Sequence, residues 1–158
     1  MAEVESLSPA LREFIESMGV YFERYGLPRI GGRILGLLLV ADRPLSLDDM
    51  ASSLRVSRAS ISTNIRLIIA SSLAEQISLP GDRRDYYRFG VDTWELALRT
   101  ELEGIAMLRR LGERGLAAAS ESERTAREHL EDLLEYCDLL MADRRDTIER
   151  WRARRREK

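Results

Sequence analysis

The sequence predicts a mainly α-helical protein that carries one small β-hairpin. Three observations support this fold class. Apolar residues recur at helical spacing through most of the 158 residues. A proline-glycine turn at Pro80-Gly81 lies between two short segments rich in apolar and aromatic residues. No proline occurs from Asp92 onward, which predicts long uninterrupted helices in the C-terminal part.

The first predicted element is an amphipathic helix between Ser8 and Arg24. Its apolar residues follow the i, i+3, i+4, i+7 spacing, at Leu11, Phe14, Ile15, Met18, Tyr21 and Phe22. Gly26 is expected to end this helix, and Pro28 suits the first turn of the next one.

The second predicted helix, which ends at Val40, is apolar on nearly all sides and is expected to be buried. It contains Gly31, Gly32 and Gly36, and a glycine in a helix costs about 0.5 to 1 kcal/mol relative to alanine. We therefore expect a neighbouring element to pack close to this backbone.

A short helix and a more polar helix come next. Ser46 and Asp49 have the spacing of a capping box at the start of a helix that carries Leu47, Met50, Ala51 and Leu54. After the turn Arg55-Val56-Ser57, the run SRASISTNI gives only the weak alternation of a poor strand, and both its neighbours have helical period. As a helix capped by Ser57, it places its isoleucines on one stripe and its small polar residues and arginines on the other side.

The segments LAEQISL and YYRFG then flank Pro80-Gly81-Asp82-Arg83-Arg84, which predicts a β-hairpin whose tip presents two arginines. Two helices are expected over 92–118 and 121–153. The last one carries an apolar stripe at Leu130, Leu133, Leu134, Cys137, Leu140, Met141, Ile148 and Trp151. The stripe could pack on its own chain. A helix of about 30 residues spans ~45 Å, which exceeds the width of a small domain, so a homodimer is favoured.

This order of elements is typical of a winged helix-turn-helix. A recognition helix enters a major groove only about 12 Å wide, so short polar side chains on its outer face suit base edges and phosphates. The residues predicted to contact double-stranded DNA are Ser57, Arg58, Ala59, Ser60, Ser62, Thr63, Asn64 and Arg66. Arg58, Ala59, Ser60 and Thr63 are the candidates for base contacts. Arg83 and Arg84 of the hairpin are expected to reach phosphate or the adjacent minor groove.

The runs GLPRIGGRILGLLL, LSLDDMASSLRVSRASISTNIRLI and PGDRRDYYRFG resemble the GbsR-type branch of the MarR family of bacterial transcriptional regulators. The resemblance implies a dimeric winged-helix repressor or activator on a palindromic operator, often controlled by a small molecule. The wing of this family usually carries an aspartate two places before an arginine, as Asp82 and Arg84 stand here. Ser72 departs from the family pattern, because a glycine commonly follows the recognition helix.

Three domains are predicted: a dimerisation helix over 1–27, the winged helix-turn-helix over 28–91, and a helical dimerisation region with a basic tail over 92–158. The net charge of −2 is unevenly spread, since only 28–91 and 144–158 are positive. The tail RWRARRREK is either a further DNA contact or the solvated basic end that helix C-termini favour.

Two alternatives stay open. A winged helix can also serve as a protein-interaction module without DNA binding, although residues 56–74 contain no carboxylate. Several aromatic residues either pack in the core or line a pocket for a small-molecule effector such as a quaternary ammonium compound. They are Tyr21, Phe22, Tyr25, Trp94 and Tyr136.

Other function classes are disfavoured. His129 and Cys137 are the only histidine and cysteine, so an intrachain disulfide is impossible, and neither a Cys/His metal cluster nor a catalytic pair is expected. We therefore expect no cofactor and no enzymatic activity. No apolar run approaches the roughly 18 residues of a membrane span, and the acidic N-terminus resembles no export signal, so the expected location is the cytoplasm.

Overall fold

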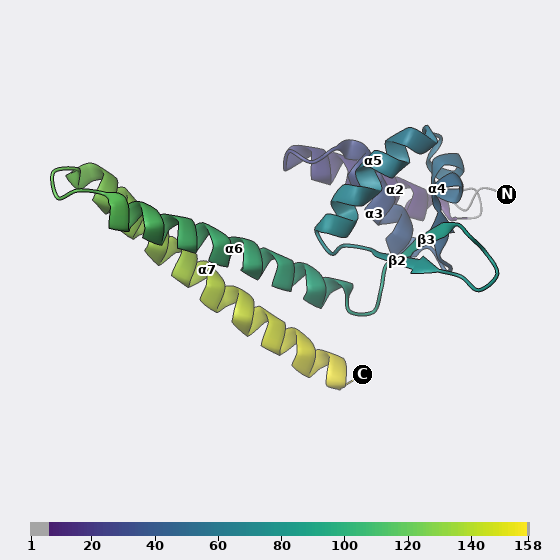
Figure 1. The fold of residues 1–158 in the computed structure, drawn as a ribbon. Helices are drawn as coiled ribbons and strands as arrows, with labels where there is room; N and C mark the ends of the chain where they lie inside the picture. The colour runs from purple at the N-terminus through teal and green to yellow at the C-terminus, as the bar shows by residue number, and fades with distance from the viewer. Residues whose placement is uncertain (1–6, 158) are drawn as a thin grey trace. The chain divides into compact units, whose positions relative to one another are not determined.

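The computed structural model describes residues 7–157, and the chain divides into two compact units, Met1–Trp94 and Glu95–Lys158. Figure 1 shows the elements of each unit. The N-terminal unit contains α2 (Pro9–Arg24), α3 (Arg29–Val40), β1 (Leu45–Ser46), α4 (Leu47–Leu54), α5 (Arg58–Ala70), β2 (Glu75–Ser78) and β3 (Asp85–Arg88). The C-terminal unit contains α7 (Arg124–Arg156) and nearly all of α6 (Thr93–Ala118).

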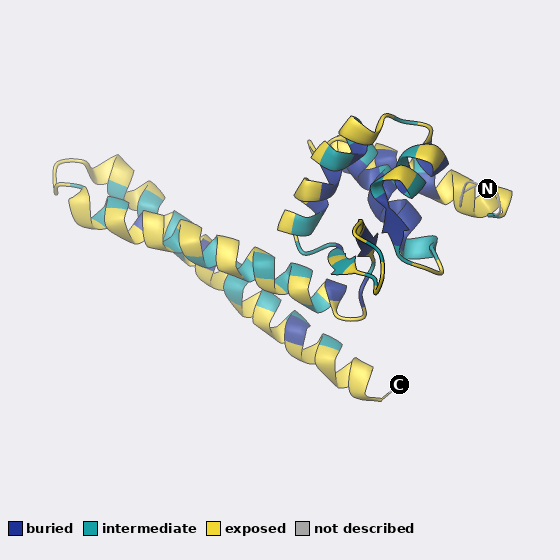
Figure 2. Cartoon of the chain, turned by 45° about the vertical axis from the view of Figure 1, so that its right-hand side comes forward, coloured by how far each residue is buried: buried dark blue, intermediate teal, exposed yellow. Residues whose placement is uncertain are grey.

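Helix α3 is the centre of the N-terminal unit, and it is buried along most of its length (Figure 2). Helix α2 packs directly on it. A β-carbon at Gly32 would overlap the Met18 carbonyl oxygen of α2, and one at Gly36 would lie 3.1 Å from the Cα of Ile15. The close approach expected from the glycines of this helix is therefore confirmed at Gly32 and Gly36. At Gly31 a β-carbon would make only ordinary contacts, with α5.

The helix-turn-helix forms as the capping residues predict. The Asp49 amide donates to the Ser46 hydroxyl at 3.2 Å and the Ser46 amide donates to the Asp49 carboxylate at 2.9 Å, which completes the capping box of α4. Arg55 takes a left-handed conformation with φ 54° and reverses the chain. Ser57 then accepts the Ser60 amide at 3.2 Å and starts α5.

The wing is a three-stranded antiparallel sheet in the order β1-β3-β2. The predicted hairpin is confirmed, with Ile77 opposite Tyr86. Strand β1 was not predicted, because two residues carry no alternating pattern. It pairs Leu45 with Tyr87 and thereby joins the start of α4 to the wing.

The end of α5 has the geometry that a glycine usually provides. Ser72 adopts φ 55°, and the next amide, that of Leu73, donates to the Ile68 carbonyl at 2.9 Å. An L-residue pays roughly 1 to 2 kcal/mol for a left-handed conformation. The departure from the family pattern at Ser72 therefore leaves the backbone path intact.

The C-terminal unit is an antiparallel pair of helices, α6 and α7 (Figure 1). Small residues on α6 allow close contact, since β-carbons at Gly112 and Gly115 would lie 3.0 Å and 3.2 Å from leucine methyl groups of α7. Cys137 is fully buried here. Part of the apolar stripe of α7 therefore packs on its own chain. This was one of the two arrangements that the sequence left open, the other being packing on a second copy. Within residues 7–157, no helix has the length and apolar character needed to cross a membrane.

Candidate nucleic-acid interface

Helix α5 turns its isoleucines inward, as predicted. Ile61, Ile65 and Ile68 are at most 4% exposed and pack in the core of the N-terminal unit. The opposite side of the helix is open. Its cap and predicted base contacts are exposed or half-buried, at Ser57, Arg58, Ala59, Ser60, Ser62, Thr63 and Arg66. Leu67 also lies on this side and is 45% exposed.

Asn64 was predicted to flank the DNA-facing side, and this placement is wrong. The side chain is only 7% exposed, and its Nδ2 donates to the Ser60 carbonyl at 2.8 Å. Position 64 lies three residues after Ile61 and four before Ile68, so the helical period places it on the buried stripe. Its polarity misled the interpretation. Its Oδ1 is buried and accepts no hydrogen bond from the described residues.

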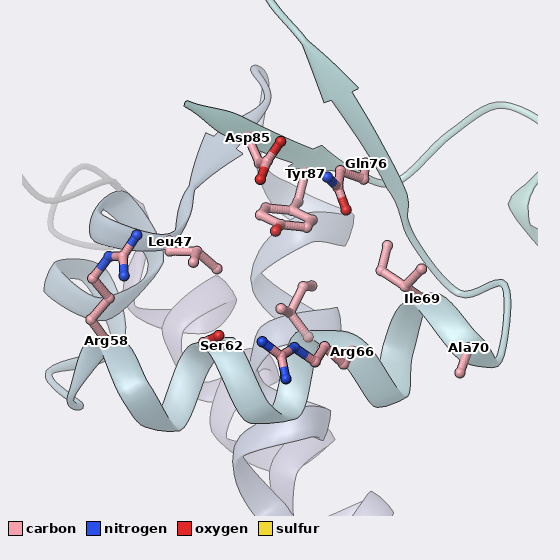
Figure 3. Close-up of a pocket in the computed structure, with 10 residues that line it drawn as sticks. Leu47, Arg58, Ser62, Arg66, Ile69, Ala70, Gln76, Asp85 and Tyr87 are labelled. Carbon is pink, nitrogen blue, oxygen red and sulfur yellow. The ribbon is translucent and has the colours of Figure 1, made fainter. Parts of the chain in front are cut away.

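A groove of about 550 Å³ separates α5 from the wing sheet (Figure 3). Helix α5 contributes Arg58, Ser62 and Arg66 to one wall, and the opposite wall includes Gln76 and Tyr87. Guanidinium, hydroxyl and amide groups therefore face a cavity between two elements that both project from the core. Such groups donate hydrogen bonds to phosphate oxygens.

Arg58 is not isolated on this surface. Its Nε lies 3.0 Å from the Oδ1 of Asp48, in the first turn of α4, and both side chains are 63% exposed. A second cavity of about 210 Å³ lies beside this pair and is lined by Ser46, Leu47, Asp48, Arg58, Arg83, Arg84 and Asp85. Solvent weakens an exposed ion pair of this kind to about 0 to 1 kcal/mol.

The wing turn is organised by a three-residue network of Asp82, Arg84 and Tyr86. The Arg84 Nη2 donates to the Asp82 Oδ2 at 2.6 Å and to the Tyr86 hydroxyl at 2.6 Å, and that hydroxyl donates to the same Oδ2 at 2.8 Å. The hydrogen bonds from the Arg84 side chain and amide hold the pKa of Asp82 well below its usual range. The hydrogen bond to the Asp82 carboxylate raises the pKa of Tyr86.

Tyr86 was missed by the sequence interpretation, which gave this residue no role beyond its place in the hairpin. The alternation of the hairpin offered a signal, because residues 82, 84 and 86 are separated by the strand period of two. The two arginines of the tip therefore differ. Arg84 is held within the turn by Asp82. Arg83 is exposed and forms no ion pair within the described residues 7–157.

The aromatic residues predicted to line an effector pocket lie on separate elements of the two units. Tyr21 lies 4.9 Å from Tyr25 and 5.9 Å from Phe22 between ring centroids, all along the end of α2. Trp94 instead packs edge-on against Phe89 at 5.1 Å. Tyr136 lies on α7 in the C-terminal unit and is exposed.

Comparison with known proteins shows a relative that matches most of the chain. The HTH-type transcriptional regulator MmpR5 of Mycobacterium tuberculosis is 36% identical over 139 residues, which cover 85% of this chain and 84% of that protein. The HTH-type transcriptional repressor OpcR of Bacillus subtilis is 24% identical over 92 residues, which cover 58% of this chain and half of the repressor. No family model matches the chain.

A solved structure described as a transcriptional regulator has the same fold. It superimposes with a TM-score of 0.85 at 32% identity and covers 92% of this chain and 99% of its own. The likeness to MmpR5 and to this structure spans the winged helix and the long C-terminal helices alike. The chain therefore belongs to the MarR family of winged helix-turn-helix transcriptional regulators, and it is a DNA-binding protein rather than an enzyme.

Proposed function

We propose that the chain is a ligand-responsive repressor of the GbsR-type branch, which binds a two-fold symmetric operator as a homodimer. The observation that carries this proposal is the open polar side of α5 beside the groove to the wing. A carboxylate-free helix face that presents arginines and hydroxyl groups complements the phosphates and base edges of DNA and would be a poor surface for an apolar partner.

In the proposed complex, α5 enters the major groove and the wing lies over the adjacent backbone. Arg58, Ala59, Ser60 and Thr63 then face base edges. Contacts to phosphate come from the cap of the helix, its flank and the wing tip, at Ser57, Ser62, Arg66 and Arg83. Arg84 supports the wing from within through Asp82. A DNA strand between α5 and the wing would also bring phosphate close to Gln76, which lines the same groove.

Exposed apolar side chains in both units support the homodimer. On α2, Leu11, Phe14 and Tyr21 belong to the predicted apolar stripe and are 38% to 56% exposed. On the C-terminal helices, Met107 and Leu139 are 59% and 63% exposed. A second copy would remove this apolar surface from water. Two recognition helices in successive major grooves would be about 34 to 36 Å apart.

Repression and the response to a ligand rest on similarity and on the aromatic residues of α2. OpcR is described as a repressor, and the sequence runs that resemble the GbsR-type branch cover the winged helix. The exposed rings of Tyr21 and Tyr25 offer electron-rich faces that suit a quaternary ammonium ligand. A regulator of transcription works where the chromosome is, so we propose a cytoplasmic location.

Selection from random DNA by the purified protein, at low and at moderate salt, tests the proposal. We expect a palindromic motif to be enriched and binding to weaken steeply with salt, because phosphate contacts release counterions. The double variant Arg58→Ala/Thr63→Ala should lose the motif, whereas the matched pair Thr147→Ala/Arg150→Ala on α7 should keep it. If the wild-type protein enriches no motif, the winged helix acts as a protein-interaction module instead.

A further inference from the structure

The surface that is proposed to meet DNA contains a carboxylate aimed at one of its arginines. Asp48 is exposed and pairs with Arg58 at 3.0 Å, and Arg58 is the first residue of the recognition helix. DNA phosphates repel carboxylates, so an aspartate at this position works against binding to any DNA.

Capping does not account for this contact. Ser46 and Asp49 complete the capping box of α4, because the backbone amide and the hydroxyl of Ser46 both donate hydrogen bonds to the Asp49 carboxylate. An acidic residue in the first turn of a helix gains from the helix dipole wherever its side chain points. The side chain of Asp48 nevertheless reaches across to α5.

The charges around the Asp48–Arg58 pair determine how much unbalanced positive charge this end of the interface presents. The cavity between α4, α5 and the wing tip is lined by Arg58, Arg83 and Arg84 and by the carboxylates Asp48 and Asp85. Arg84 is bonded to Asp82 within the wing, and Arg58 is paired with Asp48. Much of the positive charge at this end of the interface is therefore already balanced in the free protein.

We propose that Asp48 is a specificity-determining residue, whose carboxylate neutralises Arg58 in the free protein and so suppresses binding to DNA of arbitrary sequence. This inference rests on the proposed function, in which Arg58 contacts DNA. Binding to random DNA comes almost entirely from phosphate electrostatics, so a balanced arginine contributes little to it. On the operator, base-edge contacts add to the electrostatics and make the release of Arg58 from Asp48 favourable.

The test compares the wild-type protein with Asp48→Asn, which removes the charge and keeps the shape. We expect binding to random duplex DNA to tighten by about threefold to tenfold near 0.1 M salt, and the slope of log affinity against log salt to steepen by about 0.9. Binding to the selected operator should change less, so the ratio of operator to random affinity falls. A purely structural role in α4 predicts weaker or unchanged binding and no change in slope.

Two controls isolate the effect. Asp146→Asn breaks a similarly exposed aspartate-arginine pair on α7, with Arg150 at 2.6 Å, and should leave both affinities unchanged. In an Arg58→Ala background, Asp48→Asn should no longer steepen the salt slope.

An unchanged slope for Asp48→Asn, or a loss of affinity that is larger on the operator than on random DNA, would overturn the inference and leave the proposed function standing. A wild-type protein without salt-dependent DNA binding would overturn both.

Discussion

The wing arginines show how a neighbouring residue decides what a side chain can do. Arg83 and Arg84 are adjacent and both exposed, yet Arg84 is bonded to the Asp82 carboxylate and the Tyr86 hydroxyl. The sequence placed both at the hairpin tip correctly. Their separate roles depend on the conformation of the turn between β2 and β3, which the order of residues in the motif does not specify.

The pKa of Asp82 tests this network. The folded-state pKa is lowered by Arg84, so the stabilisation is complete above about pH 4, the pKa of an ordinary aspartate, and is lost only as the pH falls towards the lowered value. We expect the carboxylate of Asp82 to remain ionised near pH 3, as measured by the NMR chemical shift of its carboxyl carbon. Arg84→Gln should move this titration back towards pH 4, whereas Arg83→Gln should not. Protonation of wild-type Asp82 near pH 4 would show that the network does not form.

Thr63 and Asn64 give a second test at the residue scale. They are adjacent and polar, but Thr63 is exposed and Asn64 is buried. Thr63→Ala should cost roughly 1 to 3 kcal/mol on the operator and relax discrimination there. Asn64→Ala should leave the ratio of operator to random affinity unchanged. Fluorescence anisotropy with both DNAs measures the ratio, and an equal loss from Thr63→Ala on every sequence would contradict a base contact.

At the scale of elements, the helices were predictable because capping residues and apolar spacing agree on each of them. Ser46 and Ser57 start α4 and α5 where the sequence indicates. Strand β1 was not predictable, because its two residues become a strand only by pairing with β3. The partner of the α7 stripe was also open, since periodicity shows that a face is apolar and does not show what covers it.

The contact between α2 and α3 gives the sharpest test of an element. A β-carbon at Gly32 would overlap Met18 and lie 2.8 Å from the Phe22 Cβ, so Gly32→Ala should destabilise the protein by about 1 to 3 kcal/mol. Gly104→Ala is the matched control on α6, where a β-carbon meets nothing within 4 Å. It should stabilise by about 0.5 to 1 kcal/mol. Urea unfolding measures both, and equal effects would contradict the close packing.

At the scale of the whole molecule, the proposed homodimer places two copies of α5 on one operator. We expect the protein to sediment at twice its chain mass of 18.1 kDa. Leu139→Glu should shift it towards the monomer. Leu139 is an exposed apolar side chain of α7 that the second copy would cover in the proposed dimer, and burying a charge there is costly. Leu67→Glu is the matched control, since Leu67 is exposed on the DNA-facing helix, and this variant should stay dimeric while it loses DNA binding. A monomeric wild-type protein would contradict the proposal.

The account depends most on the outward side of α5 lying against DNA, and protection of a single thiol measures this directly. Cys137 is fully buried, so in Ala59→Cys the new thiol is the only exposed one among the described residues. Alkylation of that thiol by a maleimide should be fast in the free protein and strongly slowed by the selected operator. Ala126→Cys, at an exposed position of α7, should react equally with and without DNA. Equal reactivity of Ala59→Cys in both states, under conditions where the operator is bound, would contradict the account.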